Sequence, residues 1–197
     1  MIDLHLHFDG SLLPRMVLEL ADEQGIELPA REPDELKLFL TAPADCESLN
    51  EYLEKFDLPL LVLQTKEAIR KGMYTLASSL KEQGMLYAEI RFAPQLHTKK
   101  GLTQDQVVKA AILGLQEALA GSFFKAKLIL CCMRGTDNLE ENLLTVPTAA
   151  VYLGRGVAAV DLAGAEALYP TEDYEEDFAL ARELSVPFTI HAGEADG

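Results

Sequence analysis

Residues 157–191 have the sequence VAAVDLAGAEALYPTEDYEEDFALARELSVPFTIH. The stretch begins and ends with short apolar segments, 157–162 and 186–191, which are typical of buried strands. Between them, Phe178, Ala181 and Leu184 have the spacing of an amphipathic helix. A strand, a helix and a second strand within about 30 residues predict two parallel strands joined by a crossover helix.

The same alternation continues over the rest of the chain. Segments 2–7, 86–92 and 127–133 also have the apolar, β-branched character of strands, and a helical pattern at 107–119 follows Thr103, a predicted N-cap. Residues 15–83 contain several helical segments separated by prolines, which predicts a helical insertion after the first strand. No linker or low-complexity tract divides the sequence, so we expect residues 1–197 to form a single domain with an α/β fold and a parallel sheet.

The amino-acid composition disfavours some classes of binding partner. The 197 residues include 17 Lys and Arg and 32 Asp and Glu, a net charge of −15, which disfavours binding to nucleic acid or to an anionic membrane surface. The N-terminus shows no secretory signal, and no apolar run is long enough for a membrane span. Cys131 and Cys132 are neighbours in an apolar segment and are expected to be reduced. These features predict a soluble cytoplasmic protein.

Two histidines lie at the end of the first predicted strand, and an aspartate follows them. His5 and His7 are two residues apart, so on a strand their imidazoles point to one face, and Asp9 follows where the strand opens into a loop. Histidine nitrogens are common zinc ligands, so this pattern predicts part of a metal site. Two unrelated, half-buried histidines would give the same short pattern.

The fifth strand ends in a third histidine, His191, and Glu194 follows as a possible acid/base group. Because ligands bind at the carboxyl ends of parallel strands, His191 is expected to join His5 and His7 in one metal site. Gly164, at the end of the fourth strand, either lets the backbone approach a ligand or only turns the chain. Arg91 either touches substrate or forms a buried salt bridge with Glu89 or another carboxylate.

The fourth histidine, His97, follows Pro94 in a predicted loop and is expected at the surface. The sequence has no glycine-rich phosphate loop, no G-x-S-x-G elbow and no Cys-x-x-Cys pair, which argues against nucleoside-triphosphate chemistry and serine hydrolysis.

Three motifs in order, 5–12 (HLHFDGSL), 161–164 (DLAG) and 191–194 (HAGE), closely resemble the adenosine deaminase family of zinc-dependent amidohydrolases. The stretches 87–94 (YAEIRFAP) and 130–134 (LCCMR) are also similar to that family, and the resemblance spans the whole chain. The combination is what makes the resemblance specific, since an H-x-H start also occurs in PHP-type phosphoesterases and TatD-like nucleases.

The resemblance implies a (β/α)8 TIM barrel that hydrolyses the 6-amino group of adenosine or deoxyadenosine, giving inosine and ammonia, with water activated by one zinc ion. By motif position, His5, His7 and His191 would be zinc ligands and Glu194 the proton donor to the purine ring. His7 and Asp9 would contact substrate, with Asp9 hydrogen-bonding the ribose, and the backbone of Gly164 would contact the purine. Relatives that act on adenine tend to carry glutamate at position 9, so Asp9 favours a nucleoside substrate.

The resemblance also has departures. Phe8 replaces a more usual leucine, and Ala165 stands where several relatives have an acidic or amide residue. The chain holds only about five of the eight strand–helix units of a barrel, and nothing in it matches the family's later histidine and aspartate. We therefore expect the N-terminal part of an incomplete barrel, with the remaining C-terminal segment required for activity. Two alternatives stay open: a deaminase of adenine or another 6-aminopurine, and a catalytically incomplete fragment that acts only in binding or assembly.

Overall fold

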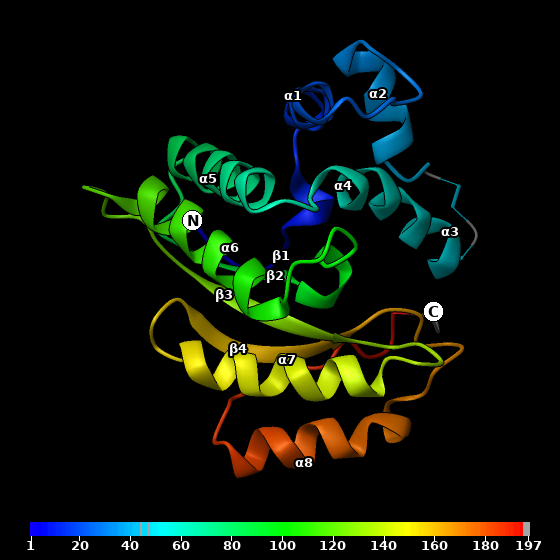
Figure 1. Cartoon of the computed structure of the whole chain (residues 1–197), viewed down its shortest axis with the longest axis vertical. Helices are drawn as coiled ribbons and strands as arrows, with labels where there is room; N and C mark the ends of the chain where they lie inside the picture. The colour runs from blue at the N-terminus through cyan, green and yellow to red at the C-terminus, as the bar shows by residue number, and fades with distance from the viewer. Residues whose placement is uncertain (44, 47, 195–197) are drawn as a thin grey trace.

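A parallel sheet of four strands forms the centre of the chain (Figure 1). The computed structural model describes residues 1–43, 45–46 and 48–194. The strands lie side by side in the order of the sequence: β1 (Ile2–His7), β2 (Tyr87–Phe92), β3 (Lys125–Met133) and β4 (Val157–Ala163). This order, with a helical segment between each pair of neighbours, confirms the α/β class and the parallel sheet.

Helices connect the strands. Between β1 and β2 lies the predicted helical insertion, with α1 (Pro14–Gln24), α2 (Pro33–Leu40), α3 (Leu49–Leu53), α4 (Asp57–Val62) and α5 (Lys66–Glu82). The later connections hold α6 (Gln104–Leu119), α7 (Leu139–Tyr152) and, after β4, α8 (Glu175–Glu183). Short 3-10 turns are η1 (Asp9–Ser11), η2 (Glu54–Phe56), η3 (Pro94–His97) and η4 (Thr171–Tyr174). Figure 1 shows α6 beside the first strands with α5 next to it, and α7 beside β4 with α8 packed against α7.

The two faces of the sheet differ in chemistry. Alternate strand residues, among them Ile90, Leu128, Leu130 and Leu162, are buried in one apolar core with the helices. Because side chains alternate along a strand, the residues between them point to the opposite face. That face carries polar groups, including Arg91 and Asp161, and it is where the histidines of β1 lie. The helices therefore stabilise the sheet from one side and leave the other side for chemistry.

The expected fifth strand follows β4. Backbone hydrogen bonds join Val160 N–H to Pro187 O, Thr189 N–H to Val160 O and His191 N–H to Leu162 O, at 2.9, 3.0 and 2.9 Å. Only the Val160–Phe188 pair is regular enough to count as a bridge, in the parallel sense. The segment 186–191 thus lies along β4 as predicted and brings His191 to the same sheet edge as β1.

Local signals explain two of the helices. Thr103 caps α6 by accepting a hydrogen bond from Gln106 N–H, while the Gln106 side chain accepts one from Thr103 N–H, a complete capping box. The helix α7 has Pro147 in its interior, where a proline lacks the N–H of a helical hydrogen bond. That proline masks the helical pattern, and sequence analysis did not single this helix out. Among the residues that the structure describes, no helix combines the length and apolar character that a membrane crossing requires.

Candidate metal centre

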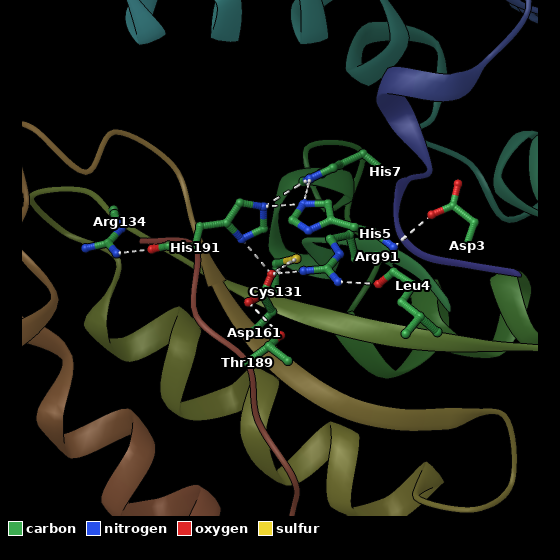
Figure 2. Close-up of polar contacts among 10 residues, drawn as sticks. All are labelled: Asp3, Leu4, His5, His7, Arg91, Cys131, Arg134, Asp161, Thr189 and His191. Carbon is green, nitrogen blue, oxygen red and sulfur yellow. Dashed lines mark hydrogen bonds and ion pairs between the residues drawn. The ribbon is translucent and has the colours of Figure 1, made fainter. Parts of the chain in front are cut away.

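Three imidazoles meet at the polar edge of the sheet (Figure 2). The Nε2 atom of His191 is 3.0 Å from that of His5 and 3.2 Å from that of His7, and the two atoms of the β1 pair are 3.3 Å apart. His5 and His7 point to the same place because they are two residues apart on β1. His191 lies at the end of the segment 186–191, which runs along β4. The structure therefore brings together the three histidines that the sequence selected.

The geometry of this cluster fits a zinc ion. Imidazole nitrogens bind zinc at about 2.0–2.1 Å, and two tetrahedral ligands at that distance are roughly 3.3 Å apart. The distances of 3.0–3.3 Å between the three Nε2 atoms agree with this value. The donor set is also suitable, because three neutral nitrogen ligands match the three-histidine sites of catalytic zinc proteins.

A buried carboxylate lies against one of these rings. Asp161 Oδ2 lies 2.8 Å from His191 Nδ1 and 2.9 Å from Arg91 Nη1, and Asp161 Oδ1 accepts a 2.8 Å hydrogen bond from the Thr189 hydroxyl. A proton held on Nδ1 leaves a lone pair on Nε2, which is the form that binds a metal. This carboxylate lies on the Nδ1 side of the His191 ring, while Nε2 faces the other two histidines (Figure 2).

The protonation states of the cluster also suit metal binding. Burial first, and then the neighbouring rings of His191 and His5, lower the pKa of His7 to about 4. Burial also lowers the pKa of His5, followed in size by the charge of Arg91. Burial by itself would raise the pKa of Asp161, but the hydrogen bonds from His191 and Thr189 and the charge of Arg91 outweigh it, so the net shift is downward. At neutral pH the two β1 imidazoles are neutral and Asp161 is ionised.

The cluster opens into a cavity of about 460 Å³, within the range typical of small-molecule sites. All of the residues that sequence analysis proposed for the site line this cavity: His5, His7, Asp9, Gly164, His191 and Glu194. Apolar side chains complete the wall, among them Tyr52, Leu53 and Phe56 of the helical insertion. The cavity therefore joins a polar histidine cluster to apolar wall groups, which suits a ligand with both polar and apolar parts.

Asp9 is buried beside the cavity, and Gly164 has a backbone conformation that favours glycine. Asp9 is buried in η1, and burial raises the pKa of its carboxyl to about 6, against a smaller lowering by the N–H groups of Asp9 and Gly10. Gly164 has φ +107°, and a side chain there would come within 3.3 Å of Met133 and 3.4 Å of Arg134. Glycine at this position therefore allows a backbone conformation and a close packing that other residues disfavour.

Two sequence expectations are resolved by the same geometry. Arg91 forms a buried salt bridge with Asp161, not with Glu89, and its Nη2 donates to Leu4 O at 2.8 Å.

The expectation that His97 is a surface residue is wrong: it is fully buried, in ring contact with Phe8 and Phe92, and its Nδ1 lies 2.9 Å from Leu63 O. The turn η3 folds back under the cavity, so a position after a proline does not place this side chain in solvent.

Sequence analysis gave no role to Asp161 or Tyr52. A signal existed for Asp161, since a carboxylate within an apolar strand needs a buried partner. Tyr52 comes from the insertion, far from the motifs, and only the fold brings it to the cavity. Burial raises the pKa of its hydroxyl, and the nearby carboxylates of Glu194 and Asp9 add to the shift.

The sequence of the whole chain matches a known protein family. Residues 1–197 match the family described as adenosine deaminase. The chain belongs to the adenosine deaminase family. An adenosine deaminase of Haemophilus ducreyi is 52% identical over 200 residues, covering 100% of this chain and 58% of that protein. One from Clostridium kluyveri is 41% identical over 192 residues, covering 98% of this chain and 55% of that protein. The chain therefore spans less than two thirds of the length of these relatives.

Two solved structures share the fold of this chain. An adenine deaminase from Arthrobacter aurescens is 28% identical, with a TM-score of 0.79, and the match covers 100% of this chain and 58% of that one. An amidohydrolase from Burkholderia ambifaria, solved with bound zinc, has a TM-score of 0.83 at 20% identity over 98% of this chain and 52% of that one. The chain is thus part of a (β/α)8 barrel, as the sequence indicated.

Proposed function

We propose that this chain forms the N-terminal part of a zinc-dependent adenosine deaminase, which hydrolyses adenosine or deoxyadenosine to inosine and ammonia. The observation that carries the proposal is the convergence of three Nε2 atoms within 3.3 Å in a cavity that Asp9 and Glu194 also line. The identity of 52% to an adenosine deaminase supports the substrate. The sequence and the site thus favour the same reaction.

In this proposal His5, His7 and His191 hold one zinc ion. When bound, zinc acts as a Lewis acid that lowers the pKa of water to about 7. Glu194 holds the proton that N1 of the purine receives as water adds at C6, so charge does not build up on the ring. The bond between C6 and the amino nitrogen then breaks, and the amino group leaves as ammonia with the proton of the hydroxyl group that was added at C6. Asp9 accepts a hydrogen bond from a ribose hydroxyl, and the backbone of Gly164 contacts the purine.

The remaining barrel strands are part of the proposal. Ile2 and Leu4 of β1 are 63% and 54% exposed at the edge of the sheet, although a barrel strand normally has a neighbour on both sides. About two fifths of the length of these relatives lies outside the matched region. We propose that a C-terminal segment of this kind covers the edge of β1 and closes the barrel. Reduced, buried Cys131 and Cys132 are consistent with action in the cytoplasm.

The test is a chimera that joins residues 1–197 to the part of the H. ducreyi adenosine deaminase beyond the matched region, which we call the completed chain. Loss of adenosine absorbance at its ultraviolet maximum measures turnover. We expect turnover that depends on zinc and that Glu194→Gln reduces at least about 100-fold with zinc content unchanged. A folded, zinc-loaded completed chain without turnover would overturn the proposal and favour a binding or assembly role.

An adenine deaminase is the second candidate, because a solved structure with that activity in its name covers the whole chain at 28% identity. Comparing turnover of adenine and adenosine by the completed chain decides between them. A preference for adenine would also contradict the ribose contact proposed for Asp9.

A further inference from the structure

The peptide segment that carries His191 and Glu194 is held from outside at three points. Arg134 Nη2 donates to His191 O at 2.8 Å. Glu166 Oε1 accepts a hydrogen bond from Gly193 N–H, and Glu166 Oε2 accepts one from Glu194 N–H, both at 3.0 Å. Two side chains far from this segment in the sequence therefore fix its backbone.

The Glu166 contact is specific in its geometry. Each carboxylate oxygen binds one of two successive N–H groups, so the peptide between Gly193 and Glu194 cannot rotate without losing a bond. Gly193 has φ +77°, a left-handed conformation that turns the chain after Ala192. Hydrogen bonds from N–H groups to an ionised carboxylate are stronger than those to a neutral acceptor. The bonds thus select one conformation of a segment that glycine leaves flexible.

The loop that carries Glu166 is itself anchored. Arg134 is buried, and it donates through Nη1 to Tyr169 O at 2.7 Å and through Nη2 to the Thr171 hydroxyl at 2.9 Å. The same guanidinium that holds the His191 carbonyl therefore also holds the loop between β4 and α8. The loop that carries Glu166 is therefore held in place by hydrogen bonds.

We propose that Glu166 is a positioning residue for Glu194: its carboxylate holds the Gly193–Glu194 peptide so that the Glu194 side chain stays in the wall of the cavity. This inference rests on the proposed function, in which Glu194 supplies the proton. It separates two tasks within one segment, because the ring of His191 is oriented by Asp161 whereas the peptide that follows is held by Glu166.

The test uses Glu166→Ala and the isosteric Glu166→Gln in the completed chain. Alanine removes both acceptors, and glutamine keeps one while its amide group faces an N–H. A displacement of about 1 Å costs about 100-fold in rate, so we expect kcat to fall 10- to 100-fold for alanine and less for glutamine. Zinc content and KM should stay within about twofold of the parent. Glu172→Ala, at an exposed position in η4, is the matched control and should keep the parent kcat.

A double-variant cycle separates positioning from general stability. If Glu166 acts through Glu194, then Glu166→Ala should lower kcat no further in a Glu194→Gln background. An additional 10-fold loss in that background, or a loss of zinc in the Glu166 variants, would assign the residue a structural role and overturn the inference. An active parent whose Glu166 variants keep full kcat overturns this inference alone. A folded parent without turnover overturns the proposed function and this inference with it.

Discussion

Asp161→Asn is expected to weaken zinc binding by the completed chain. The aspartate lies 2.8 Å from His191 Nδ1, and it accepts hydrogen bonds from Arg91 Nη1 at 2.9 Å and the Thr189 hydroxyl at 2.8 Å. Asparagine keeps the volume but offers one oxygen and no charge. Its oxygen still reaches the donors of His191 and Arg91, and the hydroxyl of Thr189 can rotate to accept from the new amide.

The size of the expected loss in zinc affinity follows from the contact between position 161 and His191, which no longer involves a charged carboxylate. A hydrogen bond to a charged group contributes about 1.5–3 kcal/mol, which corresponds to roughly 10- to 100-fold in an equilibrium constant. Loss of a carboxylate that supports a metal-bound histidine costs about the same factor in metal affinity. We therefore expect the dissociation constant for zinc to rise 10- to 100-fold.

Competition with a chromophoric zinc chelator measures that constant. Asp22→Asn, the same substitution at an exposed position of α1, is the control and should leave zinc affinity unchanged. Thr189→Val removes only the third contact of the carboxylate and should have a smaller effect than Asp161→Asn. The reasoning fails if Asp161→Asn has the circular dichroism spectrum and unfolding midpoint of the parent and binds zinc within threefold as tightly.

Three further predictions concern stability, each measured as the free energy of urea unfolding of the completed chain. Burial raises the pKa of Asp177 from 3.8 to about 6, so folding favours its protonated form, and the contribution of this residue to stability should fall as the pH rises from about 4 to about 6. Asp177→Asn removes that contribution, so the stability of the variant relative to the parent should rise over this range and reach a gain of up to about 3 kcal/mol at pH 7, whereas a difference that does not change with pH would contradict the assignment. Thr103→Ala breaks the capping box of α6 and should cost about 1 kcal/mol, whereas a cost below 0.3 kcal/mol, taken as about the error of such a measurement, would mean the cap adds nothing. Phe8→Ala should cost about 3–5 kcal/mol because this fully buried ring packs against Phe92, and a loss under about 1 kcal/mol would show that the core closes over the gap.

Periodicity predicted the parallel sheet and the polar edge well, because both depend on local pattern. The segment 2–7 has the bounds of β1, and the capping box at Thr103 begins α6 as expected. The helix α7 was not singled out because Pro147 interrupts its pattern, although neighbouring strands and α8 pack against it. Tertiary packing outweighs local propensity at that point.

The parts of the site that sequence could not supply depend on contacts between distant segments. His97 was expected in solvent, but the turn η3 places it against Phe8 and Phe92. The partner of Arg91 was left open between Glu89 and another carboxylate, and only the pairing of β2, β3 and β4 puts Asp161 within reach. Charge and hydropathy predict that a buried arginine needs an anion, but the fold decides which one.

The charges on the inner face of the sheet explain how a buried carboxylate can support a metal site. Asp161 is ionised beside Arg91, so the pair is close to neutral, and the three imidazoles add no charge in the form that binds metal. A divalent ion would then be the largest charge in the cavity, and the nearest negative group bonded to a ligand would be Asp161. Because Arg91 and Thr189 also hold this carboxylate, protein contacts and not a bound ion alone would keep Asp161 beside the His191 ring, which would reduce the reorganisation that zinc binding requires.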